Sequence, residues 1–386
     1  MPNTTQNRVM IYVQHLLGSG HLQRCLQLAG ALAVREFEVL VVSGGLPQSI
    51  PLAAGVRLHQ LPPLYSPDGS FNRLLDASGR EIDDNLRALR RRQLLEQYQS
   101  MSPGALITET FPFGRRMMSF EIIPLLETAR RDRNCVQVIS SVRDILQPKS
   151  QPRRNREIRD LVGKYYDHVL VHGDPTIAGL EYSFADARDI ADKVCYSGYI
   201  AKTDYAAPPG TDGHDEVLVS AGGSSTGLEL LKTAIAARPL TSLVQNRWRI
   251  LVSAAIGQAE FRELQQFAGR GIVVERNRTD FTGLMHRARL SISQAGYNTL
   301  TDVLGSGVAA VVIPFADADE IEQTLRARRL QQRGRLIMLE QQHLSAATLA
   351  ASIERALGLD TSLEIDLDGA PNSAAMIERW IEAAAA

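Results

Sequence analysis

Residues 216–227 read Glu-Val-Leu-Val-Ser-Ala-Gly-Gly-Ser-Ser-Thr-Gly, an apolar run that ends in a turn of small residues before a helical pattern. A fully apolar run of this length is typical of a strand buried on both faces of a parallel sheet. Successive small residues at a strand-to-helix turn offer backbone N–H groups and hydroxyls, which suit a phosphate. The turn has neither the Gly-Lys-Ser/Thr of a Walker A loop nor the dinucleotide pattern Gly-x-Gly-x-x-Gly. We therefore predict a phosphate site at this turn.

The same succession of apolar run, turn and helical pattern recurs through the chain. Strands that alternate with helices of ten or more residues indicate βαβ units and open α/β sheets. Ligands bind at the carboxyl ends of such strands, so the residues after each run are the candidates for function. The apolar runs lie at 9–13, 38–42, 105–108, 136–139 and 169–171, and again at 216–220, 249–252, 272–274, 290–293 and 309–313.

A break in this pattern at residues 203–215 contains two prolines and two glycines, as a linker does. At 386 residues the chain is also too long for one ordinary core. We predict an α/β chain with two tandem Rossmann-like domains, a cleft between them and a C-terminal helix that returns to the first domain. The predicted boundaries are 1–205 for the N-terminal domain, 206–360 for the C-terminal domain and 361–386 for the tail and its helix.

Composition and charge exclude several classes. The formal net charge is −1, which argues against a nucleic-acid binder. The three cysteines are Cys25, Cys135 and Cys195, without a close pair, which indicates a reducing compartment and no zinc site. No apolar run reaches the length of a signal peptide core or of a membrane span of about 20 residues. We expect a cytoplasmic protein, with peripheral contact at the inner face of the membrane left open.

Two residues of the N-terminal half are candidates for proton transfer. Gly18-Ser19-Gly20-His21 opens the first helix, where a histidine is suited to general-base work at neutral pH. Glu109 follows a buried strand, so its carboxylate should face the ligand side of the sheet. The alternatives are a polar first-turn residue for the histidine, and an N-cap or an arginine–carboxylate pair for Glu109. Other candidates after strands are Arg115, Arg116, Ser141, Arg143, Asp144, His172 and Asp174, which could bind an acceptor or assist deprotonation.

A third strand-to-helix turn reads Ser293-Gln-Ala-Gly-Tyr-Asn-Thr-Leu-Thr-Asp302. Gly296 and the amides of Tyr297, Asn298 and Thr299 could hold a second phosphate. Asp302 lies about one helical turn further on, where a carboxylate can bond two ribose hydroxyls; the alternative is an acid favoured by the helix dipole. Two phosphate-type turns followed by an acid fit a nucleoside diphosphate better than either turn fits alone.

The second half resembles the C-terminal domain of MurG-type glycosyltransferases, which add N-acetylglucosamine to a lipid-linked peptidoglycan precursor. Gly18-Ser-Gly-His21 is similar to a shortened form of that family's N-terminal loop. The whole chain looks closer still to a bacterial group of predicted glycosyltransferases, marked by Ile107-Thr-Glu-Thr-Phe-Pro-Phe-Gly-Arg-Arg116. The C-terminal resemblance rests on Gly222-Gly-Ser-Ser-Thr-Gly227, Asp280-Phe-Thr-Gly-Leu-Met285, Ala295-Gly-Tyr-Asn-Thr-Leu-Thr-Asp302 and Val312-Ile-Pro-Phe315 with Gln323 beyond.

The resemblance implies the GT-B architecture and a set of donor contacts. It implies that Gly222, Gly223, Ser224 and Ser225 contact the donor phosphates, and that Arg276 and Asn277 border the base. Phosphate contacts are also implied for Gly296, Tyr297, Asn298 and Thr299, a ribose contact for Asp302 and a sugar contact for Gln323. Lys202 stands about where the family has an arginine at the domain junction. The chain departs from the family in its shorter N-terminal loop, in Tyr199-Ile200 for Asn-Pro, and in Glu322-Gln323 for paired glutamines.

These observations together predict a glycosyltransferase that moves a sugar, hexosyl or N-acetylhexosaminyl, from a nucleotide-diphosphate sugar, with UDP-sugar as the favoured co-substrate. The acceptor is a sugar, a lipid-linked molecule or a small molecule, and Arg115, Arg116 and Arg143 are its candidate contacts. No cofactor and no metal are expected, because Asp317-Ala-Asp319 suits sugar hydroxyls better than a cation. Inversion at the anomeric carbon is implied by the resemblance. The alternatives are a nucleotide-sugar 2-epimerase or hydrolase of the same fold, and a non-catalytic nucleotide-sugar-binding subunit.

Overall fold

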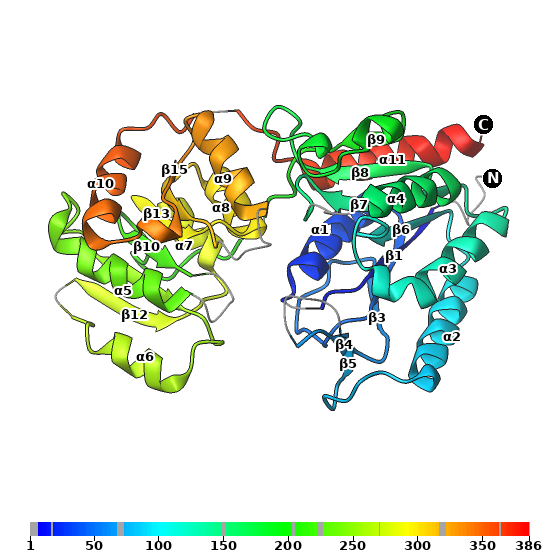
Figure 1. The fold of residues 1–386 in the computed structure, drawn as a ribbon, viewed down its shortest axis with the longest axis horizontal. Helices are drawn as coiled ribbons and strands as arrows, with labels where there is room; N and C mark the ends of the chain where they lie inside the picture. The colour runs from blue at the N-terminus through cyan, green and yellow to red at the C-terminus, as the bar shows by residue number, and fades with distance from the viewer. Residues whose placement is uncertain are drawn as a thin grey trace. The chain divides into compact units, whose positions relative to one another are not determined.

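The computed structural model describes residues 7–16, 18–67, 73–147, 152–202, 205–221, 227–269, 271–315, 322–362 and 364–385 (Figure 1). The chain forms two compact units. Unit 1 comprises Met1–Pro175, Gly179–Ile200 and Asp368–Ala386, and unit 2 comprises Thr176–Ala178 and Ala201–Leu367. Each unit is built around one parallel sheet, which confirms the predicted class of two Rossmann-like folds.

The sheet of unit 1 has seven parallel strands in the order β3-β2-β1-β6-β7-β8-β9. From β1 the chain adds β2 and β3 on one side, and from β6 it adds β7, β8 and β9 on the other side. The boundary between β1 and β6 is therefore the point where the strand order reverses, and open α/β sheets bind ligands at such a point. The strands are β1 (Arg8–Val13), β2 (Glu38–Ser43), β3 (Val56–Gln60), β6 (Ala105–Glu109), β7 (Gln137–Arg143), β8 (His168–His172) and β9 (Val194–Tyr196), with a separate hairpin of β4 (Leu64–Tyr65) and β5 (Leu75–Asp76).

Helices cover both faces of this sheet, which explains why its central strands are apolar throughout. Met10 and Tyr12 of β1 belong to one core cluster, whereas Val9, Ile11 and Val13 belong to another. The first cluster includes side chains of α2 (Asp84–Met101), α3 (Ser119–Arg131) and α4 (Pro152–Tyr165), and the second includes side chains of α1 (Gly20–Val34) and α11 (Gly369–Ala385).

The last helix, α11, returns to unit 1 as predicted. Ile377 and Ile381 are buried in the same cluster as the apolar face of α1, and Met376 and Trp380 pack against it. The indole of Trp380 stacks on the His168 ring at 3.8 Å between centroids.

The sheet of unit 2 has six parallel strands in the order β12-β11-β10-β13-β14-β15. These are β10 (Val217–Ser220), β11 (Trp248–Val252), β12 (Ile272–Arg276), β13 (Leu290–Gln294), β14 (Ala309–Ile313) and β15 (Ile337–Met338). The α-helices are α5 (Leu228–Ala237), α6 (Gln258–Gln265), α7 (Phe281–Arg287), α8 (Tyr297–Ser306), α9 (Glu322–Gln332) and α10 (Ala346–Leu357). Short 3₁₀ turns occur at Arg116–Met118, Leu180–Tyr182, Ala187–Ile190, Arg238–Leu240 and Gln341–His343.

Candidate functional site

Polar side chains gather at the carboxyl ends of β6, β7 and β8 in unit 1. In the sheet register Glu109 lies opposite Ser141, and Arg143 lies opposite His172. The Glu109 carboxylate is only 1% exposed. A buried carboxylate is costly unless it is paired and hydrogen-bonded, so its partners determine what it can do.

His21 and Glu109, predicted separately as candidate bases, form a pair. Nδ1 of His21 lies 2.8 Å from Oε1 of Glu109, and the histidine side chain remains 18% exposed. Arg24, one turn along α1 from His21, also donates to Oε1. The Thr110 hydroxyl donates to the same oxygen at 3.0 Å. The first two turns of α1 thus hold an imidazole and a guanidinium against one carboxylate oxygen.

The charges around the pair keep the carboxylate ionised and the imidazole neutral. Burial would raise the pKa of Glu109, but Arg24 and His21 hold that pKa well below its ordinary value. Burial and the nearby Arg115 lower the pKa of His21 to about 3, against the opposing effect of Glu109. An ionised carboxylate only accepts hydrogen bonds, so Nδ1 of His21 carries the ring proton and Nε2 carries the lone pair. The pair therefore presents a neutral imidazole whose basic atom is Nε2.

Two of the three predicted acceptor arginines lie near this imidazole. Arg115 and Arg143 both lower the pKa of His21 by their positive charge. Nε of Arg115 donates to the carbonyl of Gln14 at 2.7 Å, and burial together with Arg143 lowers the pKa of Arg115 to about 10. Arg116 instead forms a surface ion pair with Glu157 at 3.4 Å. Arg115 and Arg143 are therefore grouped with His21, whereas Arg116 is held at the surface.

The residues directly before His21 are Gly18, Ser19 and Gly20. Ser19 is the N-cap residue of α1 without a side-chain cap, and its hydroxyl accepts from Nε2 of Gln23 at 3.0 Å. A Cβ atom added at Gly18 would meet no atom of the described part of the chain within 4 Å. Gly20 is the first residue of the helix. The loop leaves space beside the backbone that precedes His21.

The N-terminus of α8 in unit 2 has the features of an anion site. Gly296 is its N-cap residue, the first turn holds no acidic residue, and Leu300 N–H bonds to the Gly296 carbonyl at 2.9 Å. Within the described residues the amides of Asn298 and Thr299 have no hydrogen-bond partner. Among the residues that the structure describes, a Cβ atom added at Gly296 would meet nothing within 4 Å. Tyr297 is buried, and the Arg326 guanidinium lies 5.2 Å from the centre of its ring.

Asp302 is placed in the second turn of α8 and faces α7. Its Oδ1 accepts from the Thr282 hydroxyl at 3.1 Å. Burial raises the pKa of Asp302 to about 6, while Thr282 and Lys202 act in the opposite direction. Lys202 is exposed. Near neutral pH Asp302 is mostly ionised, and hydroxyl donors favour that form.

The remaining predicted donor contacts are held by the backbone around them. Gln323 accepts from the Phe315 amide at 3.1 Å through Oε1. Arg276 donates to the carbonyls of Ser253 at 2.7 Å and Ile256 at 3.0 Å. Asn277 N–H bonds to the Val252 carbonyl at 3.1 Å. Gly222, Gly223, Ser224 and Ser225, together with Asp317 and Asp319, lie outside the described residues.

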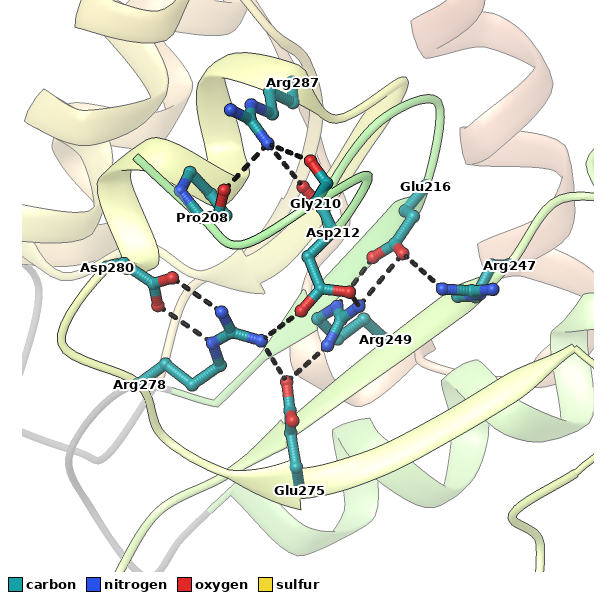
Figure 2. A network of polar contacts seen from close by, with 10 residues as sticks. All are labelled: Pro208, Gly210, Asp212, Glu216, Arg247, Arg249, Glu275, Arg278, Asp280 and Arg287. Atoms are coloured by element: carbon teal, nitrogen blue, oxygen red, sulfur yellow. Dashed lines mark hydrogen bonds and ion pairs between the residues drawn. The ribbon is translucent and has the colours of Figure 1, made fainter. Parts of the chain in front are cut away.

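A network of ion pairs lies on one face of the sheet of unit 2, beside the strand β12 that ends at Arg276 (Figure 2). Arg249 of β11 lies at its centre and is 3% exposed. It donates to Glu216 at 2.6 Å, to Glu275 at 2.6 Å and to Asp212 at 2.8 Å. Glu216 is itself 3% exposed. Such a buried arginine needs acceptors for its planar set of donors, and three carboxylates supply them.

The same network ties the linker segment to unit 2. Arg278 donates to Asp212 at 2.6 Å and to both oxygens of Asp280, and it lowers the pKa of both acids. Arg287 donates to the carbonyl of Gly210 at 3.0 Å. Figure 2 shows Asp212 and Gly210 of the linker bonded to Arg249, Arg278 and Arg287. Because Arg278 follows Arg276 and Asn277 directly, the network fixes the segment that is predicted to border the base.

Sequence reasoning missed Arg24 and the network around Arg249. The spacing of three residues between His21 and Arg24 on a helix was the available signal, because such residues share a face.

Within the described ranges no group of three or more His, Cys, Asp or Glu residues could hold a metal ion. No described helix is long and apolar enough to cross a bilayer.

Residues 217–365 match the glycosyltransferase family 28 C-terminal domain. The matched residues make up most of unit 2. The curated UDP-N-acetylglucosamine--N-acetylmuramyl-(pentapeptide) pyrophosphoryl-undecaprenol N-acetylglucosamine transferase of Ralstonia nicotianae is 34% identical over 109 residues, 28% of this chain and 30% of that protein. The transferase of the same name from Hahella chejuensis is 30% identical over 165 residues, 42% of this chain and 44% of that protein. The chain thus matches less than half the length of either relative.

Two solved structures are similar over nearly the whole chain. Spinosyn rhamnosyltransferase SpnG complexed with thymidine diphosphate has a TM-score of 0.61 at 18% identity, covering 97% of this chain and 96% of that chain. MurG of Acinetobacter baumannii has a TM-score of 0.58 at 14% identity, covering 96% and 99%. The chain has the GT-B fold. Together with the family 28 domain, this fold confirms the predicted resemblance to MurG-type glycosyltransferases.

We expect Gly296→Ala to weaken binding of a nucleoside diphosphate by roughly tenfold or more while the protein stays fully folded. The backbone at Gly296 has a φ of −62° and leaves open space at Cβ, so alanine fits without strain. The added methyl group would stand where a phosphate approaches the amides of α8. Calorimetric titration with UDP measures the change.

Gly307→Ala is the matched control at the other end of the same helix. Gly307 also has open space at Cβ, but its φ is +69°, which a residue with a side chain adopts at a cost of about 1 kcal/mol. This variant should lose stability and keep its affinity for UDP. Unchanged affinity in Gly296→Ala would remove the phosphate site from α8.

Proposed function

We propose that the chain is a glycosyltransferase that moves a sugar from a nucleoside diphosphate donor to a hydroxyl of an acceptor. The observation that carries the proposal is the pairing of His21 with Glu109 at 2.8 Å. A family 28 domain and the GT-B fold support the reaction class. The pair supports catalysis rather than binding alone, because the buried Glu109 carboxylate orients the partly exposed imidazole of His21.

In the proposed reaction Nε2 of His21 accepts the proton of the acceptor hydroxyl. The oxygen forms a bond to the anomeric carbon of the sugar as the bond from that carbon to the donor phosphate oxygen breaks. The nucleoside diphosphate leaves with the electron pair. Glu109 stabilises the imidazolium that forms, and the amides at the N-terminus of α8 stabilise charge on the leaving diphosphate. We propose inversion at the anomeric carbon, because the acceptor oxygen attacks in a single displacement.

The favoured donor is a UDP-sugar carrying a hexosyl or N-acetylhexosaminyl group. The relatives of the family 28 domain are named for UDP-N-acetylglucosamine, and one structural neighbour is complexed with thymidine diphosphate. The same relatives are named for a pyrophosphoryl-undecaprenol acceptor, which supports a lipid-linked acceptor and work at the inner membrane face. Arg115 and Arg143 are the acceptor contacts that we favour, and we propose that the reaction needs no metal and no cofactor besides the nucleotide sugar.

Thermal unfolding with UDP, GDP and dTDP tests the donor assignment. A ligand that binds only the folded state at 100 times its Kd adds about 2.7 kcal/mol of stability. We expect UDP to raise the unfolding temperature most and EDTA to leave that rise unchanged. A protein that none of the three diphosphates stabilises would contradict the donor site.

Product analysis with UDP-sugars then tests the reaction class. Transfer releases UDP and leaves the sugar attached to the acceptor. Free sugar with UDP would indicate a hydrolase, and an epimerised UDP-sugar would indicate a 2-epimerase. Binding without turnover, unaffected by changing His21, would indicate a non-catalytic subunit.

A further inference from the structure

A chain of buried hydrogen bonds continues from Glu109 into the interior of unit 1. The Ser141 hydroxyl donates to Oε2 of Glu109 at 2.7 Å. Nε2 of His172 lies 2.9 Å from the same hydroxyl, and Nδ1 of His172 lies 3.0 Å from the Ser197 hydroxyl. Ser373 of α11 approaches the same Nδ1 at 3.5 Å. All of these side chains are buried.

The proton positions along this chain follow from one constraint. Glu109 is ionised and can only accept, so the single proton of Ser141 is donated to Oε2. The Ser141 oxygen must then accept from His172, which places the ring proton of His172 on Nε2. Burial lowers the pKa of His172 to about 3, so the ring is neutral and its Nδ1 is an acceptor for the Ser197 hydroxyl. The protons of His172 Nε2 and of the Ser141 hydroxyl therefore both point toward Glu109.

The two oxygens of Glu109 are used differently. Oε1 accepts from His21, Arg24 and Thr110, whereas Oε2 accepts from the Ser141 hydroxyl at 2.7 Å and more weakly from the Cys25 thiol at 3.7 Å. A carboxylate held by only one oxygen can rotate about its terminal bond, which is broad in its torsional preference. The hydrogen bond from Ser141 to Oε2 resists that rotation and keeps Oε1 facing Nδ1 of His21.

We propose that Ser141 and His172 are positioning residues that act through Glu109 to hold His21 with its proton on Nδ1. The expected effect on kcat rests on the proposed function. The tautomer of His21 does not, because it is a property of the protein alone. Neither residue touches the reacting atoms. His172 acts by donating to Ser141, and Ser141 acts by donating to Glu109.

Nitrogen-15 NMR of the histidine side chains tests the proposal without any substrate. In the unaltered protein we expect His21 to be protonated at Nδ1 and unprotonated at Nε2. In Ser141→Ala and His172→Phe we expect a mixture of tautomers at His21. Ser141→Thr keeps the hydroxyl and His172→Gln keeps a donor toward Ser141, so both should restore the Nδ1–H form.

Ser140→Ala is the matched control, because Ser140 is the neighbouring buried residue of β7 and its hydroxyl donates to the Phe111 carbonyl at 2.8 Å. It should leave the His21 tautomer unchanged even if it lowers stability. With the true acceptor, Ser141→Ala should lower kcat by roughly tenfold to a hundredfold at constant KM, as for loss of a hydrogen bond to a charged group.

The positioning role and the proposed function are contradicted by different results. A single His21 tautomer, the same in Ser141→Ala, His172→Phe and the unaltered protein, overturns the positioning role. A tautomer that shifts as expected in a protein without transferase activity supports the positioning role and overturns the proposed function.

Discussion

His21→Ala should lower kcat by roughly 10²–10⁴-fold and leave the affinity for the nucleoside diphosphate within a few-fold. Alanine removes the one partly exposed imidazole that Glu109 orients, and with it the acceptor for the hydroxyl proton. The donor amides at α8 are unaffected, because they belong to unit 2. Steady-state kinetics with UDP-sugar, together with calorimetric titration of UDP, separates the two effects.

The pH dependence identifies the base within the pair. Since the pKa of His21 is lowered to about 3, the free protein keeps an unprotonated Nε2 far below the ordinary histidine pKa of 6.5. At saturating donor we expect kcat to stay level from about pH 8 to about pH 5 and to fall only at lower pH, as the imidazole takes up a proton, whereas kcat/KM for the donor should already fall near pH 6 as Asp302 is protonated. Glu109→Gln should also lose activity, because its amide donates to Nδ1 and moves the ring proton to Nε2. If both variants turn over at the unaltered rate, neither residue takes part in catalysis.

Arg249→Ala should destabilise unit 2 by about 3–5 kcal/mol. Arg249 and Glu216 are each 3% exposed and bond at 2.6 Å, so removal of the guanidinium leaves the Glu216 carboxylate buried without its main partner. The loss is that of an uncompensated buried charge, which exceeds what an intact pair contributes. Urea unfolding followed by circular dichroism measures the change in free energy.

Arg247→Ala is the control for that experiment. Arg247 also pairs with Glu216, at 3.5 Å, but it is 50% exposed, so its loss should cost less than about 1 kcal/mol. Equal losses for the two arginines would show that burial of the Arg249 network does not govern the stability of unit 2.

The central strands of both sheets could be predicted because both of their faces are covered. Val9–Val13 and Val217–Ser220 are buried throughout, and their continuous apolar sequences reflect that burial. The edge strand β3 (Val56–Gln60) escaped prediction, because only its first residue is buried and its sequence has no apolar run. The edge strand β9 (Val194–Tyr196) also escaped prediction, because it is only three residues long and all three are half-buried.

The sequence allowed individual residues of the site to be predicted, but not the contacts between them. The position of His21 after a glycine turn and of Glu109 after a strand marked both side chains, whereas their 88-residue separation concealed the hydrogen bond between them. Arg24 was missed because an arginine on an amphipathic helix is normally a solvent-facing residue, and only the buried carboxylate explains why it is 3% exposed. Arg116 and Arg115 are adjacent in sequence, yet the backbone turn at Arg115, with a φ of +59°, separates their environments.

The return of α11 to unit 1 also dictates an order of assembly during synthesis. Arg35 at the end of α1 bonds to Glu378, 343 residues later, and Gln137 bonds to the Trp380 carbonyl, 243 residues later. When all of unit 2 has left the ribosome, α11, the helix that covers the apolar face of α1, has not yet been made. Unit 2 can therefore fold before unit 1 is complete, and unit 1 exposes a hydrophobic surface until α11 emerges from the ribosome. The half of the molecule that is translated first is thus the half that is finished last.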